Sequence, residues 1–275
     1  MDRRSNASGR VPRAAKVAKH ARPEPVNAAA AAGIRAPASP RWAAVDFFRG
    51  CAILAMIIYH FCFDLAFNGW LVADFGEDLR WIWFRIPVLG SFLFIAGVSL
   101  GLAEARRQTG AQFWRRVRLI AGAAALVSLG SYIMFPGSFI YFGVLHAIAL
   151  MSILARPALR WGLWAMVLGL AVLVIGVTVQ HPFFNQPPLH WIGLMTFKPR
   201  TEDYVPLFPW FGVMLIGAGA GTWAAQHPGW PDRLAAWVVP HRLGWIAWLG
   251  RHSLAVYLLH QPLLVGAMLL IRQIH

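Results

Sequence analysis

The chain has 275 residues, of which 58% are hydrophobic and 13% are charged. Soluble domains carry about twice that charged fraction, so the composition excludes an ordinary soluble domain. The net charge of +14 does not predict nucleic-acid binding, because the basic residues lie in the N-terminal tail and in short loops, where membrane topology accounts for them.

The first 40 residues differ from the rest of the chain. They combine scattered basic residues with an alanine run and several prolines, and no apolar stretch precedes Trp42, so we do not expect them to be a cleavable signal peptide by themselves. We expect residues 1–40 to be a disordered basic arm that contacts anionic membrane lipid. Residues 41–275 then form a transmembrane domain.

Seven apolar segments of roughly bilayer-spanning length follow the arm. In chain order they are 45–67, 82–103, 117–135, 139–154, 161–179, 207–225 and 254–271, with a short interfacial helix over 243–249. The 14 tryptophans agree with this reading, because tryptophan collects at bilayer interfaces. The sequence therefore predicts an all-α, polytopic membrane helix bundle of about seven transmembrane helices.

The spacing of the glycines predicts close helix packing, and the spacing of the cysteines argues against a disulfide. Gly97 and Gly101 are four residues apart, as are Gly217 and Gly221, and this spacing lets membrane helices approach closely. The two cysteines, at 51 and 62, fall in one predicted helix about three turns apart and cannot pair with each other. We predict neither a disulfide nor a bound metal.

The loop charges predict an orientation. The loops after the second, fourth and sixth segments carry the cations Arg106, Arg107, Arg115, Arg116, Arg118, Arg156, Arg160, Arg233, Arg242 and Arg251. The opposite loops carry Asp74, Glu77, Asp78, Glu202 and Asp203. Because cytoplasmic loops are rich in cations, we expect a multi-pass protein of the bacterial inner membrane, with its N-terminus in the cytoplasm and its C-terminus outside.

Asp46 and Arg49 open the first segment. They are three residues apart and share a helix face, and Asp46 lies at the helix N-terminus, where a negative charge is favourable. One interpretation is an interfacial ion pair. The other is that Arg49 contacts a phosphate-bearing donor from the cytoplasm.

His60 and Asp64 lie deeper in the same segment. From Asp46 to His60 is 14 residues, roughly 21 Å along a helix, which places His60 towards the outer side of the membrane. Asp64 follows one turn later, where its carboxylate can orient the imidazole and raise its basicity. The pair is therefore the predicted catalytic site. The alternative is a buried histidine that bonds a neighbouring helix.

Other polar residues at membrane depth are second-tier candidates for a cavity. Arg85, at the outer end of the second segment, either ties to Asp64 or Asp78 or steadies an anion. His146 and His260 are each either packing residues or part of one polar cavity, and Tyr257 is on the same face as His260.

The loop over 180–205 is the longest on the outer side. Its aromatic residues stand beside carboxylates, Asp203 among them, which suits a sugar-like ligand. An interfacial loop with a tryptophan belt is the alternative.

The stretch Asp46-Phe-Phe-Arg49-Gly50 resembles the opening helix of the heparan-alpha-glucosaminide N-acetyltransferase catalytic-domain family, in its short bacterial form. Further stretches fit the same family: Phe94-Ile-Ala-Gly97-Val-Ser99-Leu, Phe142-Gly143-Val-Leu-His146, Asp203-Tyr204-Val-Pro206-Leu-Phe-Pro209-Trp210-Phe-Gly212 and Leu249-Gly250-Arg-His-Ser253-Leu-Ala-Val-Tyr257-Leu-Leu-His260-Gln261-Pro262. The resemblance runs from Arg41 to the C-terminus.

The resemblance implies transfer of an acetyl group from cytoplasmic acetyl-CoA, as co-substrate, to the amine or hydroxyl of an extracytoplasmic carbohydrate. The animal enzymes of this family acetylate a terminal glucosamine amine with a histidine just after the first span. This sequence has no histidine at Asn68-Gly69, and His60 and Asp64 lie slightly earlier. His60 is then a general base or a transient acetyl carrier, with Asp46 and Arg49 on the donor side.

Two other classes of protein stay open. In a proton-coupled transporter or permease, the intramembrane histidines and aspartates would form a proton relay or a substrate path. In a non-catalytic scaffold they would only lock helices together. The sequence also leaves open whether the chain forms a homo-oligomer.

Overall fold

The computed structural model describes residues 42–134, 136–199, 201 and 203–274. The basic arm predicted over residues 1–40 lies outside the described residues. The helices are α2 (Ala43–Phe67), α3 (Leu79–Ala105), α4 (Gly110–Met134), α5 (Val144–Ala155), α6 (Leu163–Thr178), α7 (Trp210–Gln226), α8 (Trp230–Ala236), α9 (Gly244–Arg251) and α10 (Ser253–Ile274). A short 3-10 helix (Arg156–Trp161) follows α5, and two more (Pro182–Asn185 and Pro187–Ile192) lie in the loop between α6 and α7. The predicted all-α fold is confirmed.

Each predicted membrane segment coincides with a helix, but not every helix is long enough to cross a bilayer. Five stretches meet that requirement by length and hydropathy, namely α2, α3, α4, α10 and Val144–Trp161, which is α5 with the turn that follows it. The helices α6 and α7 have 16 and 17 residues, or about 24–26 Å, against a hydrocarbon core of about 30 Å. The count of seven spans therefore stays a prediction.

The fourth helix begins later than predicted, at Val144 instead of residue 139. The preceding residues run extended: the backbone N–H of Ile140 donates to Ser131 Oγ, and the carbonyl of Phe142 accepts from the N–H of Val205. Because these backbone groups are used by partners outside the helix, the helix can only begin after Gly143.

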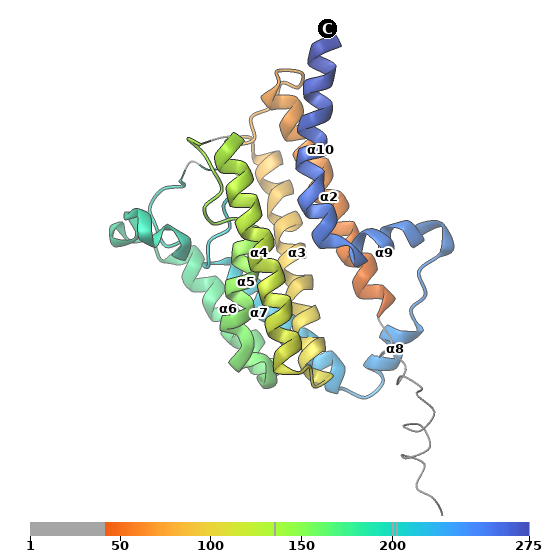
Figure 1. Cartoon of the computed structure of the whole chain (residues 1–275). Coiled ribbons are helices and arrows are strands. Elements are labelled where there is room, and N and C mark those ends of the chain that lie inside the picture. Colours follow the sequence, from red (N-terminus) through yellow and green to blue (C-terminus); the bar gives the residue numbers. More distant parts are fainter. Residues whose placement is uncertain (1–41, 135, 200, 202, 275) are drawn as a thin grey trace, which may run out of the picture. The chain divides into compact units, whose positions relative to one another are not determined.

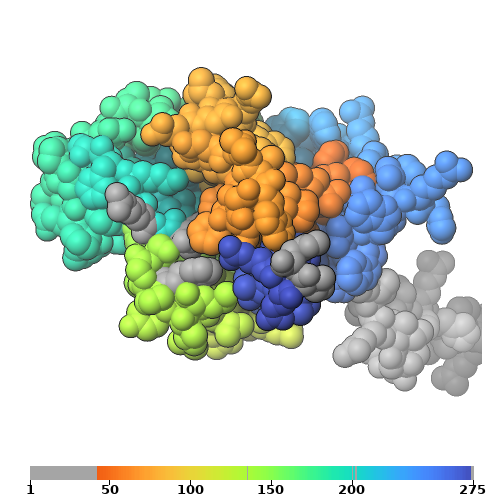
Figure 2. Space-filling view, turned by 90° about the horizontal axis from the view of Figure 1, so that it is seen from above, coloured from red at the N-terminus to blue at the C-terminus, as the bar shows by residue number. Residues whose placement is uncertain are grey.

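Figure 1 shows α2 and α10 running side by side, with α3, α4, α5 and α7 forming the rest of the bundle. Figure 2 shows the loop between α6 and α7 on one flank and the α8–α9 segment on the opposite flank, with α2 and α10 between them. The buried core joins α3, α5 and α7, where Leu93, Leu100, Met151, Met214 and Leu215 are almost fully buried.

The predicted close packing of small residues is confirmed between α3 and α7. A Cβ atom at Gly97 would overlap the carbonyl of Met214, and a Cβ at Gly221 would overlap the carbonyl of Val98. Since each helix presents glycine to the backbone of the other, the two axes approach more closely than larger side chains would allow.

The arginines of different loops gather at one end of the bundle, where α2 begins and α3 ends. We call it the basic end. Arg106, just after α3, lies over the ring of Trp42 at 3.9 Å, and Arg156, just after α5, lies over the ring of Phe113 at 4.5 Å. Two of the loops that were predicted to share one side of the membrane, those after α3 and α5, therefore share one end of the bundle. That this end faces the cytoplasm stays a prediction.

Candidate functional site

Arg49 joins three helices at the basic end. Its Nη1 donates to Asp46 Oδ1 at 2.8 Å and to the carbonyl of Gly250 at 3.3 Å, and its Nη2 donates to Ser99 Oγ at 2.6 Å. The ion pair is mostly shielded, because the side chains of Arg49 and Asp46 are 21% and 15% exposed. The pair predicted from the three-residue spacing is thus present, and it braces α2 against α3 and α9.

The brace depends on the glycines of α2 and α9. A Cβ at Gly50 would overlap the carbonyl of Ile246, and a Cβ at Gly250 would overlap the carbonyl of Asp46. The two helices therefore meet backbone to backbone and run in opposite directions. This contact brings the carbonyl of Gly250 within reach of Arg49.

Arg116 of α4 adds a second cation beside Arg49. The two guanidinium groups are close enough to interact electrostatically. Together with Asp46 they carry a net charge of +1 in a half-buried position, where charges are screened less than on an open surface. This basic cluster of Asp46, Arg49 and Arg116 is suited to attract the phosphate groups of a ligand.

Two histidines meet further along the same helix. The ring of His60 on α2 lies against the ring of His260 on α10, with centroids 5.1 Å apart and planes at 61°. His260 is 8% exposed, and His60 is half-buried. The sequence placed both histidines at membrane depth, but it did not predict that they touch.

Asp64 does not orient His60, contrary to the prediction. The buried carboxylate of Asp64 accepts from Gln261 Nε2, at 3.0 Å to Oδ1 and 3.2 Å to Oδ2, and no hydrogen bond between Asp64 and His60 is found in the described part of the chain. Residues four apart on a helix are close enough to interact, but here α10 brings the amide of Gln261 to the carboxylate. We call His60, Asp64, His260 and Gln261 the histidine cluster.

Two polar atoms of this cluster are buried without a partner. Nδ1 of His260 is 2.6 Å from the carbonyl oxygen of Tyr257, but its Nε2 has no hydrogen bond to any described residue. The Oε1 of Gln261 is in the same state. Buried polar groups are nearly always hydrogen-bonded, so these two atoms mark a place where a ligand can bind.

Asp203 and Tyr257 are brought together as well. Asp203 Oδ2 accepts from the backbone N–H of Val144 at 2.8 Å and from the hydroxyl of Tyr257 at 3.3 Å. The carboxylate also fills the space that a Cβ at Gly143 would need. Burial raises the pKa of Asp203 above its usual range, against the two hydrogen bonds, which lower it. Asp203 therefore caps α5 and connects it to α10.

His146 is not part of the histidine cluster. Its Nδ1 accepts from the backbone N–H of Gly143 at 3.3 Å, and its Nε2 lies 3.1 Å from Ser128 Oγ. Since Nδ1 accepts, Nε2 carries the proton in the neutral ring and donates to the hydroxyl. Both ring nitrogens are satisfied, so His146 serves the N-terminus of α5 instead of lining a cavity with His260.

Arg85 pairs with neither carboxylate that the sequence offered. Asp78 accepts from the backbone N–H of Arg80 and caps α3. Among the described residues, the groups that interact with Arg85 are the Tyr59 hydroxyl and the ammonium of Lys198. Partial burial and the charge of Arg85 lower the pKa of Lys198. The structural tie to Asp64 or Asp78 is therefore not found among the described residues, and the interpretation that Arg85 steadies an anion stays a prediction.

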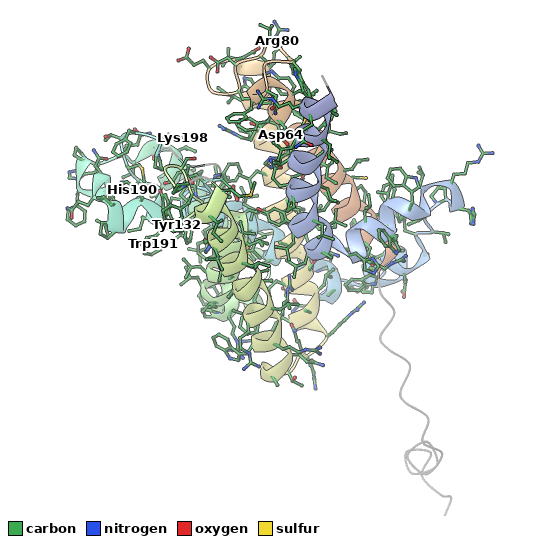
Figure 3. All side chains as sticks on the ribbon, turned by 45° about the horizontal axis from the view of Figure 1, so that its top comes forward. Asp64, Arg80, Tyr132, His190, Trp191 and Lys198 are labelled. Carbon is green, nitrogen blue, oxygen red and sulfur yellow. The ribbon has the colours of Figure 1, made fainter. Side chains whose placement is uncertain are left out.

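Lys198 belongs to the loop between α6 and α7, which was singled out for its aromatic residues. Figure 3 labels His190, Trp191 and Lys198 on this loop and Asp64 beside α10. The loop contains an open pocket of about 270 Å³, lined by Gln180, Gly193, Met195, Thr196, Phe197, Lys198 and Tyr204. Within the described residues, no group of three metal-ligating side chains could hold a metal ion.

Sequence reasoning missed Gln261 and Ser99. Both stand in stretches that the resemblance had singled out, beside His260 and Gly97 respectively. Their hydrogen-bond partners could not be predicted from the sequence, because Ser99 bonds a residue 50 positions away and Gln261 bonds one 197 positions away. Adjacency to a candidate histidine was the one available signal for Gln261.

A bundle of apolar helices with a polar cluster in its interior defines a polytopic membrane protein with an intramembrane site. The family described as heparan-alpha-glucosaminide N-acetyltransferase, catalytic, matches residues 41–262. The chain belongs to this family, and the match contains every candidate site residue described above. No curated protein and no solved structure matches the chain. Family and helices together make the chain a membrane acetyltransferase, in general terms.

Proposed function

We propose that the chain transfers an acetyl group from acetyl-CoA, bound at the basic end, to the amine or hydroxyl of a sugar presented at the opposite end. In this proposal the basic end faces the cytoplasm of a bacterium and the acceptor is extracytoplasmic. The excess of arginine at the basic end supports this orientation. The reaction thereby links two compartments through the helix bundle.

The observation that carries the proposal is the contact between His60 and His260, together with the unpartnered Nε2 of His260. An imidazole is the side chain best suited to accept or donate a proton near neutral pH. Two of them in contact inside a bundle, one with an empty acceptor position, are unfavourable for folding alone. A substrate that supplies the missing hydrogen bond would account for them.

The donor side of the proposal rests on the basic cluster. Arg49 and Arg116 would attract the phosphates of CoA, and Asp46 would hold Arg49 in place. Eleven residues of α2 separate Arg49 from His60, or roughly 16 Å. CoA carries its thioester at the end of a long flexible arm, so the phosphates can stay at the basic cluster while the acetyl group reaches the histidines.

The acceptor side rests on the loop between α6 and α7. Phe197 and Tyr204 offer aromatic surface in the pocket, and Lys198 offers a cation beside them. Aromatic faces with polar groups at their edge suit the mixed surface of a sugar. His60 would then act as general base, or carry the acetyl group between donor and acceptor.

The test is incubation of the purified full-length protein, in lipid nanodiscs, with labelled acetyl-CoA and a panel of amino sugars and neutral sugars. CoA release that depends on one acceptor class supports the proposal and separates N- from O-acetylation. His60→Ala should abolish the release, and His227→Ala, at an exposed histidine at the end of α7, is the matched control. Uptake of an intact solute into proteoliposomes without CoA release would instead support a permease.

A further inference from the structure

Two consecutive residues of α10 share an unusual state. Within the described part of the chain, His260 and Gln261 each have one polar side-chain atom with a hydrogen-bond partner and one buried polar atom with none. His260 contacts His60 and Gln261 contacts Asp64, so both side chains lie against α2 within one turn of each other. The two atoms without a hydrogen-bond partner, His260 Nε2 and Gln261 Oε1, therefore lie in the same interface between α2 and α10.

The contact with Tyr257 fixes the tautomer of His260. A carbonyl oxygen can only accept, so the Nδ1 of His260, 2.6 Å away, must carry the proton. In the neutral ring Nε2 then presents a lone pair. The nearest acidic group of the cluster, Asp64, is bound to Gln261, and an imidazolium buried without an anionic partner is unfavourable. His260 is therefore held as a neutral base with Nε2 empty.

Asp64 fixes Gln261 in the same way. An ionised carboxylate only accepts, so the amide must turn its Nε2 towards Asp64. The reversed amide would place Oε1 against the carboxylate. Asp64 thereby keeps the Oε1 of Gln261 available as a second acceptor in the interface.

We propose that, of the two histidines, His260 is the general base: its Nε2 accepts the proton of the attacking amine or hydroxyl, while His60 packs against its ring and positions it. Gln261 Oε1 accepts a hydrogen bond from a second donor of the same substrate. The acceptor is then a compound with at least two donor groups, such as an amino sugar or a polyol. Asp64 is a positioning residue that acts through Gln261. This inference rests on the proposed function and assigns the roles within its site.

The step balances as follows. The nitrogen or oxygen of the acceptor forms a bond to the acetyl carbonyl carbon while its proton passes to His260 Nε2. The bond from that carbon to the CoA sulfur breaks, and its electron pair leaves with the sulfur. The resulting thiolate takes up a proton, and His260 returns to its neutral form by releasing one to water.

The decisive variant is His260→Asn. The amide nitrogen of asparagine replaces Nδ1 as donor to the Tyr257 carbonyl, so the variant removes the empty base and keeps the bond that holds the helix. We expect kcat for acetyl transfer to fall about a hundredfold to ten-thousandfold, with the KM for acetyl-CoA unchanged. His260→Gln, which reaches the Nε2 position without basicity, should behave alike.

The matched control is His252→Asn. His252 also bonds a backbone carbonyl through Nδ1, at 2.9 Å to Trp248, but it is exposed. Its substitution should leave kcat unchanged. If wild-type protein transfers acetyl groups and both His260 variants stay within about threefold of it, the inference is wrong while the proposed function stands. If wild-type protein itself shows no acetyl transfer, the proposed function fails first.

The positioning role of Asp64 has its own test. In the Asp64→Asn variant the new amide can pair with either orientation of the Gln261 amide. The KM for the acceptor should therefore rise about tenfold, which corresponds to the loss of roughly one hydrogen bond. Acceptor-independent hydrolysis of acetyl-CoA should stay constant. In a Gln261→Ala background the same change should have no further effect, because coupled residues are not additive. Additive effects in this cycle would overturn the role assigned to Asp64.

Discussion

The two polar clusters on α2 differ in how completely their hydrogen bonds are met. At the basic end Arg49 uses both terminal nitrogens, to Asp46 and Gly250 through one and to Ser99 through the other. In the histidine cluster, His260 Nε2 and Gln261 Oε1 are buried, and neither has a partner among the residues that the structure describes. Polar side chains on α2 therefore do not by themselves indicate a site, because those at the basic end brace three helices. The unmet hydrogen bonds distinguish the histidine cluster, which is the proposed reaction site.

The largest effect should come from the histidine cluster. His60→Ala removes the ring that lies against His260, and we expect acetyl transfer to fall about a hundredfold to ten-thousandfold. Among the described residues, none forms a hydrogen bond with the His60 side chain. The thermal unfolding midpoint of the His60→Ala variant should therefore stay close to that of wild type. Turnover is measured by CoA release. A variant that keeps full turnover would remove His60 from the mechanism.

The opposite pattern is expected at the basic end. Arg49→Gln loses charged hydrogen bonds between three helices, each worth about 1.5–3 kcal/mol, and should lower stability in detergent unfolding. Arg49→Lys should fall in between, since one ammonium cannot reproduce the fork of a guanidinium. Arg115→Gln, at an exposed arginine of α4, is the control. An unchanged unfolding midpoint for Arg49→Gln would mean that the brace is not structural.

The same brace can be disturbed from the backbone side. Gly250→Ala forces a methyl group against the carbonyl of Asp46, and overpacking of this kind destabilises by about 1–3 kcal/mol. The folded fraction should still transfer acetyl groups at the wild-type rate per active molecule. Gly266→Ala on α10 has open space around the new methyl and should not destabilise. Equal unfolding midpoints for the two alanine variants would contradict the close contact.

The smallest effect should come from Tyr257→Phe. The variant loses one hydrogen bond to Asp203, worth about 1 kcal/mol, but Asp203 keeps its bond to Val144 and still caps α5. The carbonyl of Tyr257 that holds His260 is unchanged. We therefore expect a small drop in unfolding midpoint and a kcat within about threefold of wild type. A loss as large as that of His60→Ala would place the tyrosine hydroxyl in the reaction.

The elements of the fold could be predicted from the sequence, and the partners of the polar residues could not. Apolar length located the helices, and a three-residue spacing sufficed for the pair of Asp46 and Arg49, because both are on one helix. The same reasoning paired His60 with Asp64 and was wrong. The spacing of two residues in the sequence shows only that they share one face of a helix. Which residue of another helix contacts that face, here Gln261, depends on how α10 packs against α2.

The start of α5 shows a second limit. Apolar residues continue from 139 to 154, so the composition predicts one helix over this whole range. It does not indicate that residues up to Gly143 are extended. The helix begins there because Asp203, 59 residues away, supplies the cap for the N–H of Val144. The sequence left His146 open as a packing residue or part of a cavity for the same reason, since its partners, the backbone N–H of Gly143 and the Ser128 hydroxyl, could not be predicted.

The segment from Gly250 to His260 is only eleven residues long, and both of its ends are held by contacts with α2. Its first residue is held by Arg49 and its last lies against His60. Since α9 ends at Arg251 and α10 begins at Ser253, the corner between the two helices lies between these contacts. The contacts on either side of the corner therefore fix the direction in which α10 leaves α9 along α2.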